Sequence, residues 1–236
     1  MLKVLDSAVP VSCWSCSVAH NESTLFCPHC SKIQPPRGGD CFSVFGLKPH
    51  LNLDLAALER EFHRLSRKLH PDRFARAGED EKQWSLADTA LLNDAYRTLK
   101  DPLRRTEYLL KLQGTDVGES AETETGPAGS ARKNPSHVPA DLLEEVFGLN
   151  MQLEEMRAAK KANHEDIELK QGLVSAKEKF EGLVDAVDRD LHAQWAIWDA
   201  GDLSVRPAAQ HAMAALLDRR RYLSHLVRDV TEVLGD

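Results

Sequence analysis

The sequence predicts an all-α protein made of two helical parts and preceded by a small cysteine-rich module. Apolar residues between 55 and 69 recur every three or four positions, and from residue 139 onwards charged and aliphatic residues alternate at the same helical spacing. Residues 11–32 instead contain two Cys-x-x-Cys pairs. Outside these pairs the sequence has no convincing strand pattern and no internal repeat, which favours a helical fold over sheet-based architectures.

Composition limits the classes of function. The 236 residues, 42% of them hydrophobic, allow one sizeable core or two to three small ones. The formal net charge of -7 argues against a nucleic-acid partner, because neutralising phosphates needs an excess of Lys and Arg. Charges recur too often to leave the roughly eighteen apolar residues that cross a bilayer. We therefore expect neither nucleic acid nor membrane as a partner.

The N-terminal sequence MLKVLDSAVPVSCWSC contains one Lys, one Asp and no Arg. It resembles neither a secretory signal nor an Arg-rich transit peptide. We therefore expect a cytoplasmic protein, with a mitochondrial location as the alternative. A reducing compartment favours metal ligation by cysteines over disulfide formation.

Two cysteine pairs, Cys13 with Cys16 and Cys27 with Cys30, are separated by ten residues. Each Cys-x-x-Cys turn places two thiolates on one side of a tight knuckle, and two facing knuckles complete a tetrahedral sulfur site. We predict a structural zinc ion here, because so short a segment cannot bury enough apolar surface to fold without one. A redox pair is the alternative, although the sequence supplies no preceding strand for it. Cys41 is alone and is expected to be a small buried side chain.

An amphipathic helix is expected over residues 55–69, with Asp54 as its N-cap. One face of it is apolar and the opposite side is basic. A basic stripe by itself is usually only a solvated face, so it assigns no function. The apolar face consists of Leu55, Leu58, Phe62, Leu65 and Leu69, and the basic side of Arg60, Arg64, Arg67 and Lys68.

A turn follows this helix at His70-Pro71-Asp72. Pro71 disfavours helical backbone at His70 and therefore ends the helix. A second periodic helix begins near Asp80 and contains LLNDAYRTL at 91–99. Two antiparallel helices would present the tripeptide at their tip.

Three segments, in this order, resemble the J-domain family of co-chaperones: CFSVFGL at 41–47, KLHPD at 68–72 and NDAY at 93–96. The resemblance implies a partner, an ATPase chaperone of the seventy-kilodalton heat-shock type, whose ATP hydrolysis the J-domain triggers. Basic side chains would steer the domain onto an acidic partner, and the rigid turn would supply the specific contact. By resemblance, the chaperone-binding residues are His70, Pro71 and Asp72, with Arg64, Arg67, Lys68 and Arg73 as electrostatic partners.

A narrower resemblance, to the HscB family, comes from DPLRRTEYLLKLQG at 101–114 and from the LLEE sequence at 142–145 that opens the last helical part. This family handles the iron-sulfur cluster scaffold protein, which is therefore a second expected partner. A four-cysteine N-terminal module occurs in some members. The implied fold is a J-domain helical hairpin plus a C-terminal three-helix bundle, preceded by a small zinc-knuckle module.

The predicted domains follow shifts in composition. The run PPRGG at 35–39 marks the first boundary, and a stretch rich in Gly, Ser, Thr, Glu and Pro marks the second. The four parts are a zinc-binding module at 1–39, the J-domain at 40–114, a flexible linker at 115–137 and a scaffold-binding helical bundle at 138–236.

Helices of the bundle are expected near 140–161, 165–199 and 206–234. Gly201-Asp202 is the clearest interior turn. Trp195 and Trp198 are expected to pack inside the bundle.

Leu143, Phe147 and Met151 form an apolar stripe at i, i+4 and i+8, and Glu155 continues the same side. By resemblance this stripe and nearby Phe180 bind the scaffold protein. The stripe could equally be the core of the bundle. A second apolar face leaves both interpretations open, since one face can pack inward while the other binds; it consists of Leu142, Val146, Leu149, Leu153 and Met156.

The sequence contains no nucleophile with a base, no phosphate-binding Gly loop and no metal site with an open position, so we expect no enzyme. The expected function is that of a co-chaperone that stimulates the ATPase chaperone and delivers the cluster scaffold to it. Two alternatives stay open: a general J-domain co-chaperone with other clients, and a zinc-dependent protein-interaction adaptor.

Overall fold

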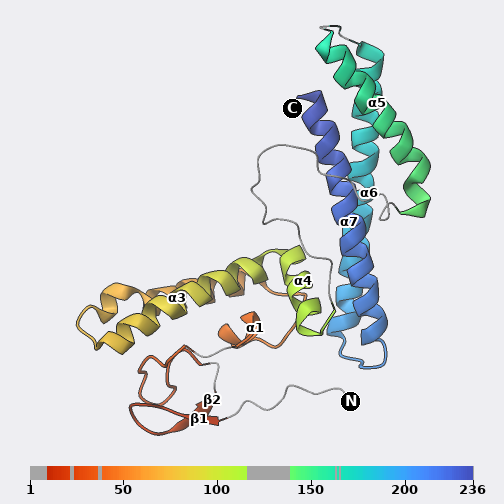
Figure 1. Ribbon diagram of the computed structural model, residues 1–236. Helices are drawn as coiled ribbons and strands as arrows, with labels where there is room; N and C mark the ends of the chain where they lie inside the picture. The colour runs from red at the N-terminus through yellow and green to blue at the C-terminus, as the bar shows by residue number, and fades with distance from the viewer. Residues whose placement is uncertain are drawn as a thin grey trace. The chain divides into compact units, whose positions relative to one another are not determined.

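The computed structural model describes residues 10–21, 24–36, 39–115, 139–162, 164 and 166–235. Helices dominate (Figure 1), and the strands of the described residues are two short ones near the N-terminus, β1 (Pro10–Ser12) and β2 (Ala19–Asn21). The predicted all-α fold is confirmed.

Two compact units make up the chain, one up to Leu109 and one from Leu110 onwards. The division falls within α4 (Pro102–Leu112). The predicted linker at 115–137 lies outside the described residues, apart from Thr115, so the predicted domain boundaries stay predictions.

A helical hairpin is the centre of the first unit, and its first helix is α2 (Leu55–Leu69). The Ala57 N–H donates to the Asp54 carboxylate at 2.9 Å, so Asp54 is the N-cap that the sequence predicted. The helix ends where His70 adopts extended backbone, with ψ at 129°, because a residue before proline avoids helical geometry.

The second helix of the hairpin, α3 (Glu79–Lys100), packs against α2. A short 3-10 turn, η1 (Pro71–Phe74), connects them. The rings of Phe62 and Tyr96 stack across the hairpin, with centroids 4.1 Å apart. On the apolar face of α2, Phe62 is half-buried and Leu55, the first residue of the helix, is 45% exposed. The buried residues of the two helices include Leu58, Leu65, Leu69, Leu92, Ala95 and Leu99.

The short helix α1 (Cys41–Val44) lies against α3. The Cys41 N–H donates to the Tyr108 hydroxyl at 2.8 Å, which ties α1 to α4. Cys41 is half-buried, not fully buried as expected, because this end of α1 remains open to solvent. Burial nevertheless raises the pKa of its thiol.

The second unit contains the predicted three-helix bundle, formed by α5 (Leu143–Lys161), α6 (Ile167–Asp199) and α7 (Arg206–Leu234). Helices α6 and α7 lie side by side along much of their length, and α5 packs on both (Figure 1). The bend between α6 and α7 contains Gly201 at φ +84°, a conformation that favours glycine.

The ends of the bundle helices lie close to their predicted positions. The main difference is at the start, where Ala140–Leu142 form a 3-10 turn before α5 begins. Trp195 and Trp198 are buried on α6, as expected. The core of the bundle includes Leu149, Leu153, Leu173, Phe180, Leu223 and Val230.

Candidate functional site

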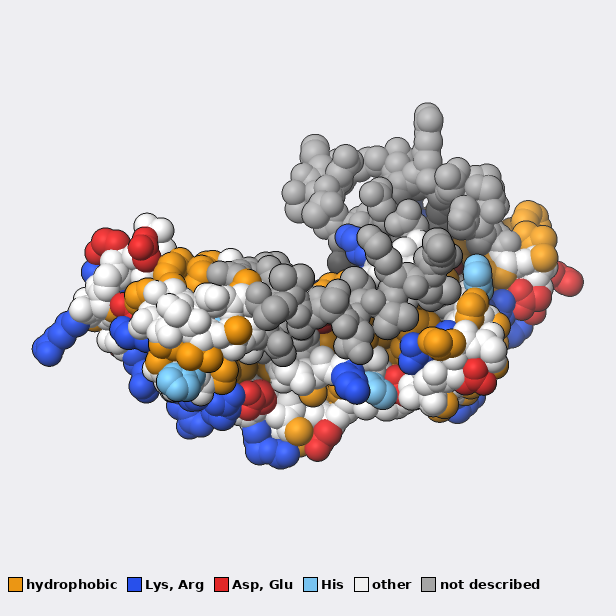
Figure 2. Space-filling view, turned by 90° about the horizontal axis from the view of Figure 1, so that it is seen from below, with side chains coloured by type: hydrophobic (Ala, Val, Ile, Leu, Met, Phe, Trp, Pro, Cys, Tyr) orange, Lys and Arg blue, Asp and Glu red, His pale blue; other side chains and the backbone are white. Residues whose placement is uncertain are grey.

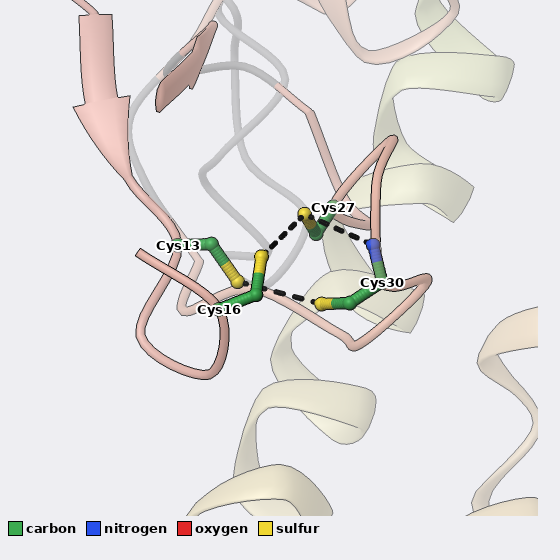
Figure 3. A group of neighbouring side chains, drawn as sticks. All are labelled: Cys13, Cys16, Cys27 and Cys30. Atoms are coloured by element: carbon green, nitrogen blue, oxygen red, sulfur yellow. Dashed lines mark hydrogen bonds between the residues drawn. The ribbon is translucent and has the colours of Figure 1, made fainter. Parts of the chain in front are cut away.

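The four paired cysteines come together near the N-terminus. Their sulfur atoms all lie within 4.8 Å of one another and point into a common centre between two loops (Figure 3). The Sγ atoms of Cys13 and Cys30 are 3.6 Å apart, and those of Cys16 and Cys27 are 3.7 Å apart. A disulfide would need about 2.0 Å. The site is therefore a cluster of four free thiols that could bind one metal ion.

The two loops that carry these thiols have the same backbone design. In each loop the residue four positions after the first cysteine, Ser17 or Ser31, has a positive φ, at 60° and 58°, and donates its N–H to that cysteine's carbonyl at 2.9 Å. The N–H groups of Cys13 and Cys27 each bond a carbonyl five residues further on. Two matching knuckles thus face each other, as the spacing of the cysteines predicted.

Hydrogen bonds to sulfur orient the thiols. The Ser15 N–H donates to the Cys13 sulfur and the His29 N–H to the Cys27 sulfur, each at 3.4 Å. The side-chain amide of Gln34 also donates to the Cys13 sulfur at 3.4 Å. Sequence reasoning missed Gln34, because it approaches Cys13 only after the chain has folded. It also missed Ser17 and Ser31, although the serine that directly follows each Cys-x-x-Cys pair is a local signal that could have identified them.

The four thiols influence one another's ionisation. Burial alone raises the pKa of Cys13, but hydrogen bonds from the backbone of Cys16 and Ser15 outweigh it and lower this pKa to about 6. The pKa of Cys16 rises to about 12, because burial and the neighbouring thiols outweigh the lowering by the Val18 backbone. Thiolates this close repel one another, so the fully ionised set needs a cation among them.

The turn at the tip of the hairpin is open to solvent. The side chains of His70 and Asp72 are 58% and 91% exposed, and His70 Nδ1 lies 3.5 Å from a carboxylate oxygen of Asp72. The Asp72 N–H also donates to His70 Nδ1, at 3.3 Å. Pro71 begins the 3-10 turn and fixes its backbone. The structure therefore holds the tripeptide in a defined and accessible conformation.

The basic residues beside this turn are exposed as well. Figure 2 shows Lys and Arg side chains gathered at one edge of the molecule, at the left, with hydrophobic side chains beside them. Arg64 donates to the carboxylate of Glu61, one helical turn earlier. This carboxylate compensates part of the positive charge of Arg64. The four cations predicted to face a partner, Arg64, Arg67, Lys68 and Arg73, all lie on the solvent side of α2 and η1.

A second exposed surface lies on α5. Leu143, Phe147 and Met151 are 55%, 68% and 51% exposed. Glu155, one turn after Met151, is exposed as well. All five residues of the other apolar face, from Leu142 to Met156, are buried instead. The stripe is therefore not the core of this bundle, which answers the question that the sequence left open. We call Leu143, Phe147 and Met151 the α5 stripe.

Phe180 does not join the α5 stripe. It is 2% exposed and belongs to the core between the three helices. Its side chain therefore cannot contact a partner directly, and the expectation from resemblance is corrected at this residue. Helical spacing on α6 gave no sign of which apolar residues would face α5 and α7.

Within the described residues, no helix combines the length and the apolar character that crossing a membrane requires.

No model of a protein family matches the chain. Among curated proteins, the iron-sulfur cluster co-chaperone protein HscB of Homo sapiens is 33% identical over 171 residues, which is 71% of this chain and 65% of that protein. The mouse protein of the same name is 36% identical over 119 residues, 49% of this chain and 51% of its own length. The chain thus matches between half and two thirds of these relatives.

Comparison of structures extends the match over more of the chain. The crystal structure of human co-chaperone protein HscB superposes with a TM-score of 0.61 at 25% sequence identity, covering 94% of this chain and 98% of that one. The similarity therefore includes the hairpin and the three-helix bundle together. In sequence and in fold, the chain is similar to the HscB co-chaperones.

Proposed function

We propose that the chain is a co-chaperone of iron-sulfur cluster assembly, which stimulates an ATPase chaperone of the seventy-kilodalton heat-shock type and delivers the cluster scaffold protein to it. The exposed His70-Pro71-Asp72 turn, held at the end of two packed helices, carries the proposal. The human and mouse relatives, which are named iron-sulfur cluster co-chaperones, support the role in cluster assembly.

The turn and the basic side chains would have different tasks in binding the chaperone. The carboxylate of Asp72 is almost fully exposed on a backbone that Pro71 restricts, so it can make a specific contact at a small cost in conformational entropy. The cations on α2 would accelerate the encounter with an acidic surface and make its rate depend on salt. No bond in ATP is broken by this chain, since hydrolysis takes place in the partner.

The α5 stripe is the proposed binding surface for the scaffold protein. Three large apolar side chains, each more than half exposed and spaced one helical turn apart, form a contiguous apolar surface on a rigid helix. Burying such side chains against a partner would supply much of the binding free energy, at roughly 25 cal/mol per Å² of apolar area. Glu155 would lie at the polar rim.

Zinc is the proposed occupant of the four-cysteine cluster. Cys13, Cys16, Cys27 and Cys30 offer four thiolates, the ligand set of closed structural zinc sites. A tetrahedron with zinc–sulfur distances of about 2.3 Å has sulfur–sulfur distances of about 3.8 Å, close to the 3.6 and 3.7 Å in the structure. A closed set of thiolates leaves no position for a substrate, so the ion would stabilise the module without catalysing a reaction.

Two purified partners test the proposal and separate it from its alternatives. The chain should accelerate single-turnover ATP hydrolysis by the chaperone, and adding a cluster scaffold protein should increase the stimulation further. Stimulation of the ATPase with no binding of the scaffold would favour a general J-domain co-chaperone with other clients. Binding without any stimulation would favour a zinc-dependent adaptor.

A further inference from the structure

A groove of about 870 Å³ lies between the four-cysteine module and the helical hairpin, within the first unit. The module forms one wall and α1, α2 and the residues after the tip form the others. We call it the basic groove. Its apolar lining includes Phe26, Ile33, Val44, Phe45, Leu65 and Phe74.

Three contacts fix the module against the hairpin. The ammonium group of Lys32 lies 3.0 Å from a carboxylate oxygen of Glu81 on α3. The Trp14 ring meets Trp84 edge-on, with centroids 5.6 Å apart. On α2, the ammonium group of Lys68 lies 5.8 Å from the centre of the Phe26 ring. The module is therefore not a detached appendage, because it shapes a surface jointly with α2 and α3.

The charge of the basic groove is unbalanced. Its two carboxylates are already engaged, that of Glu81 with the module and that of Glu61 with Arg64. The other two cations, Lys68 and Arg73, form no ion pair with a carboxylate in the described part of the chain, although the charge of Lys68 helps to lower the pKa of Glu61. A bound segment with acidic side chains would compensate these two charges, and an apolar side chain between its acidic residues would pack against the apolar lining of the groove.

We infer that the basic groove binds an acidic segment of the ATPase chaperone, so that the four-cysteine module is part of the chaperone-binding surface. The inference rests on the proposed function. Arg64, Lys68 and Arg73, three of the residues proposed to receive the chaperone, are also walls of the groove. The groove therefore continues that surface, and an acidic segment bound there would contact the module and α2 at the same time.

Two neighbouring residues of one knuckle offer a matched test. Pro28 and His29 are both exposed and lie between the ligands Cys27 and Cys30, but only Pro28 lines the groove. Pro28→Glu places a negative charge at its rim, and His29→Glu adds the same charge beside it. Zinc content and circular dichroism should first establish that both variants keep the module folded.

The measurement is the concentration of the chain that gives half-maximal stimulation of the purified ATPase chaperone. Pro28→Glu should raise this concentration about tenfold, because it repels an acidic segment, and should leave the maximal stimulation unchanged. His29→Glu should behave like the parent. An Asp72→Asn variant should instead lower the maximum, which separates the groove from the turn.

The outcomes distinguish the inference from the proposed function. If the parent stimulates the ATPase and Pro28→Glu does so equally well, binding of the chaperone in the groove is ruled out and the proposed co-chaperone function stands. Equal increases of the half-maximal concentration in Pro28→Glu and His29→Glu also overturn the inference, since the effect would then come from a charge anywhere in the knuckle and not from a charge in the groove. A parent that stimulates no such chaperone refutes the proposed function, and the inference falls with it.

Discussion

Asp88 on α3 is a buried carboxylate without a hydrogen-bond partner for either oxygen in the described structure. Burial raises its pKa from 3.8 to about 7, because a carboxylate loses its hydration there. Between these two values the folded chain keeps a proton that the unfolded chain has released. Stability therefore falls as the pH rises through this range, and the cost is fully present above pH 7.

Replacing this carboxylate by an uncharged amide should remove that cost. We expect Asp88→Asn to be more stable than the parent at pH 8, by about 1 kcal/mol or more. The advantage should shrink as the pH is lowered towards 4, where Asp88 is neutral in both states. Chemical denaturation at several pH values measures it, and an advantage that does not vary with pH would contradict this account.

Individual residues differ in how far the sequence could predict them. The four-cysteine cluster and the Asp54 cap were predictable, because both depend on short spacings along the chain. Phe180 and Asp88 were not. Whether an apolar or acidic side chain on a helix is buried depends on which neighbours pack against it, and these come from distant parts of the chain.

Among the elements, the four-cysteine module should depend most on its metal. It has two strands of three residues each and few buried apolar side chains, so we expect its folding to need the free energy of metal binding. We expect one zinc per chain by elemental analysis, lost when Cys27→Ser and Cys30→Ser are combined. Hydrogen exchange should then show loss of protection over 11–36, while α5 to α7 stay protected. Full zinc content in this variant would contradict the ligand assignment.

The α5 stripe should bind the scaffold without contributing to the bundle's core. Replacing Leu143, Phe147 and Met151 together by Ala should weaken scaffold binding at least about tenfold. The helix content by circular dichroism should not change, since exposed positions alter stability by about 0.5 kcal/mol each and Ala favours helices.

A matched control uses apolar residues on α6 that are also exposed. Ile167 and Val174 are 65% and 40% exposed and lie outside the α5 stripe. Changing both to Ala should leave scaffold binding as in the parent. Unfolding of the triple α5 variant, or equal loss of binding in the α6 control, would show that the stripe is not a specific binding surface.

The elements themselves were predicted well, because their signals are local. The apolar spacing, the Asp54 cap and the His70-Pro71 stop gave the limits of α2, and Gly201 marked the bend between α6 and α7. The docking of the module on the hairpin was not predictable. It depends on single contacts between distant residues, such as Trp14 with Trp84, for which the sequence contains no periodic pattern.

At the scale of the whole molecule, the proposed binding surfaces belong to different units. The hairpin turn lies in the first unit and the α5 stripe in the second, and each unit has its own core. A substitution at one surface should therefore leave the other intact. Under the proposed function, this separation would allow one chain to hold a scaffold protein and stimulate an ATPase at the same time.

Single-turnover ATP hydrolysis by the chaperone, with the parent and with Asp72→Asn, tests the central claim most directly. The side chain of Asp72 is 91% exposed, so the variant should fold normally. It should lose the stimulation, since removing a central interface residue costs about 2 kcal/mol or more, while scaffold binding through the α5 stripe stays at the parent's level. If Asp72→Asn stimulates the ATPase as well as the parent does, the co-chaperone account is wrong.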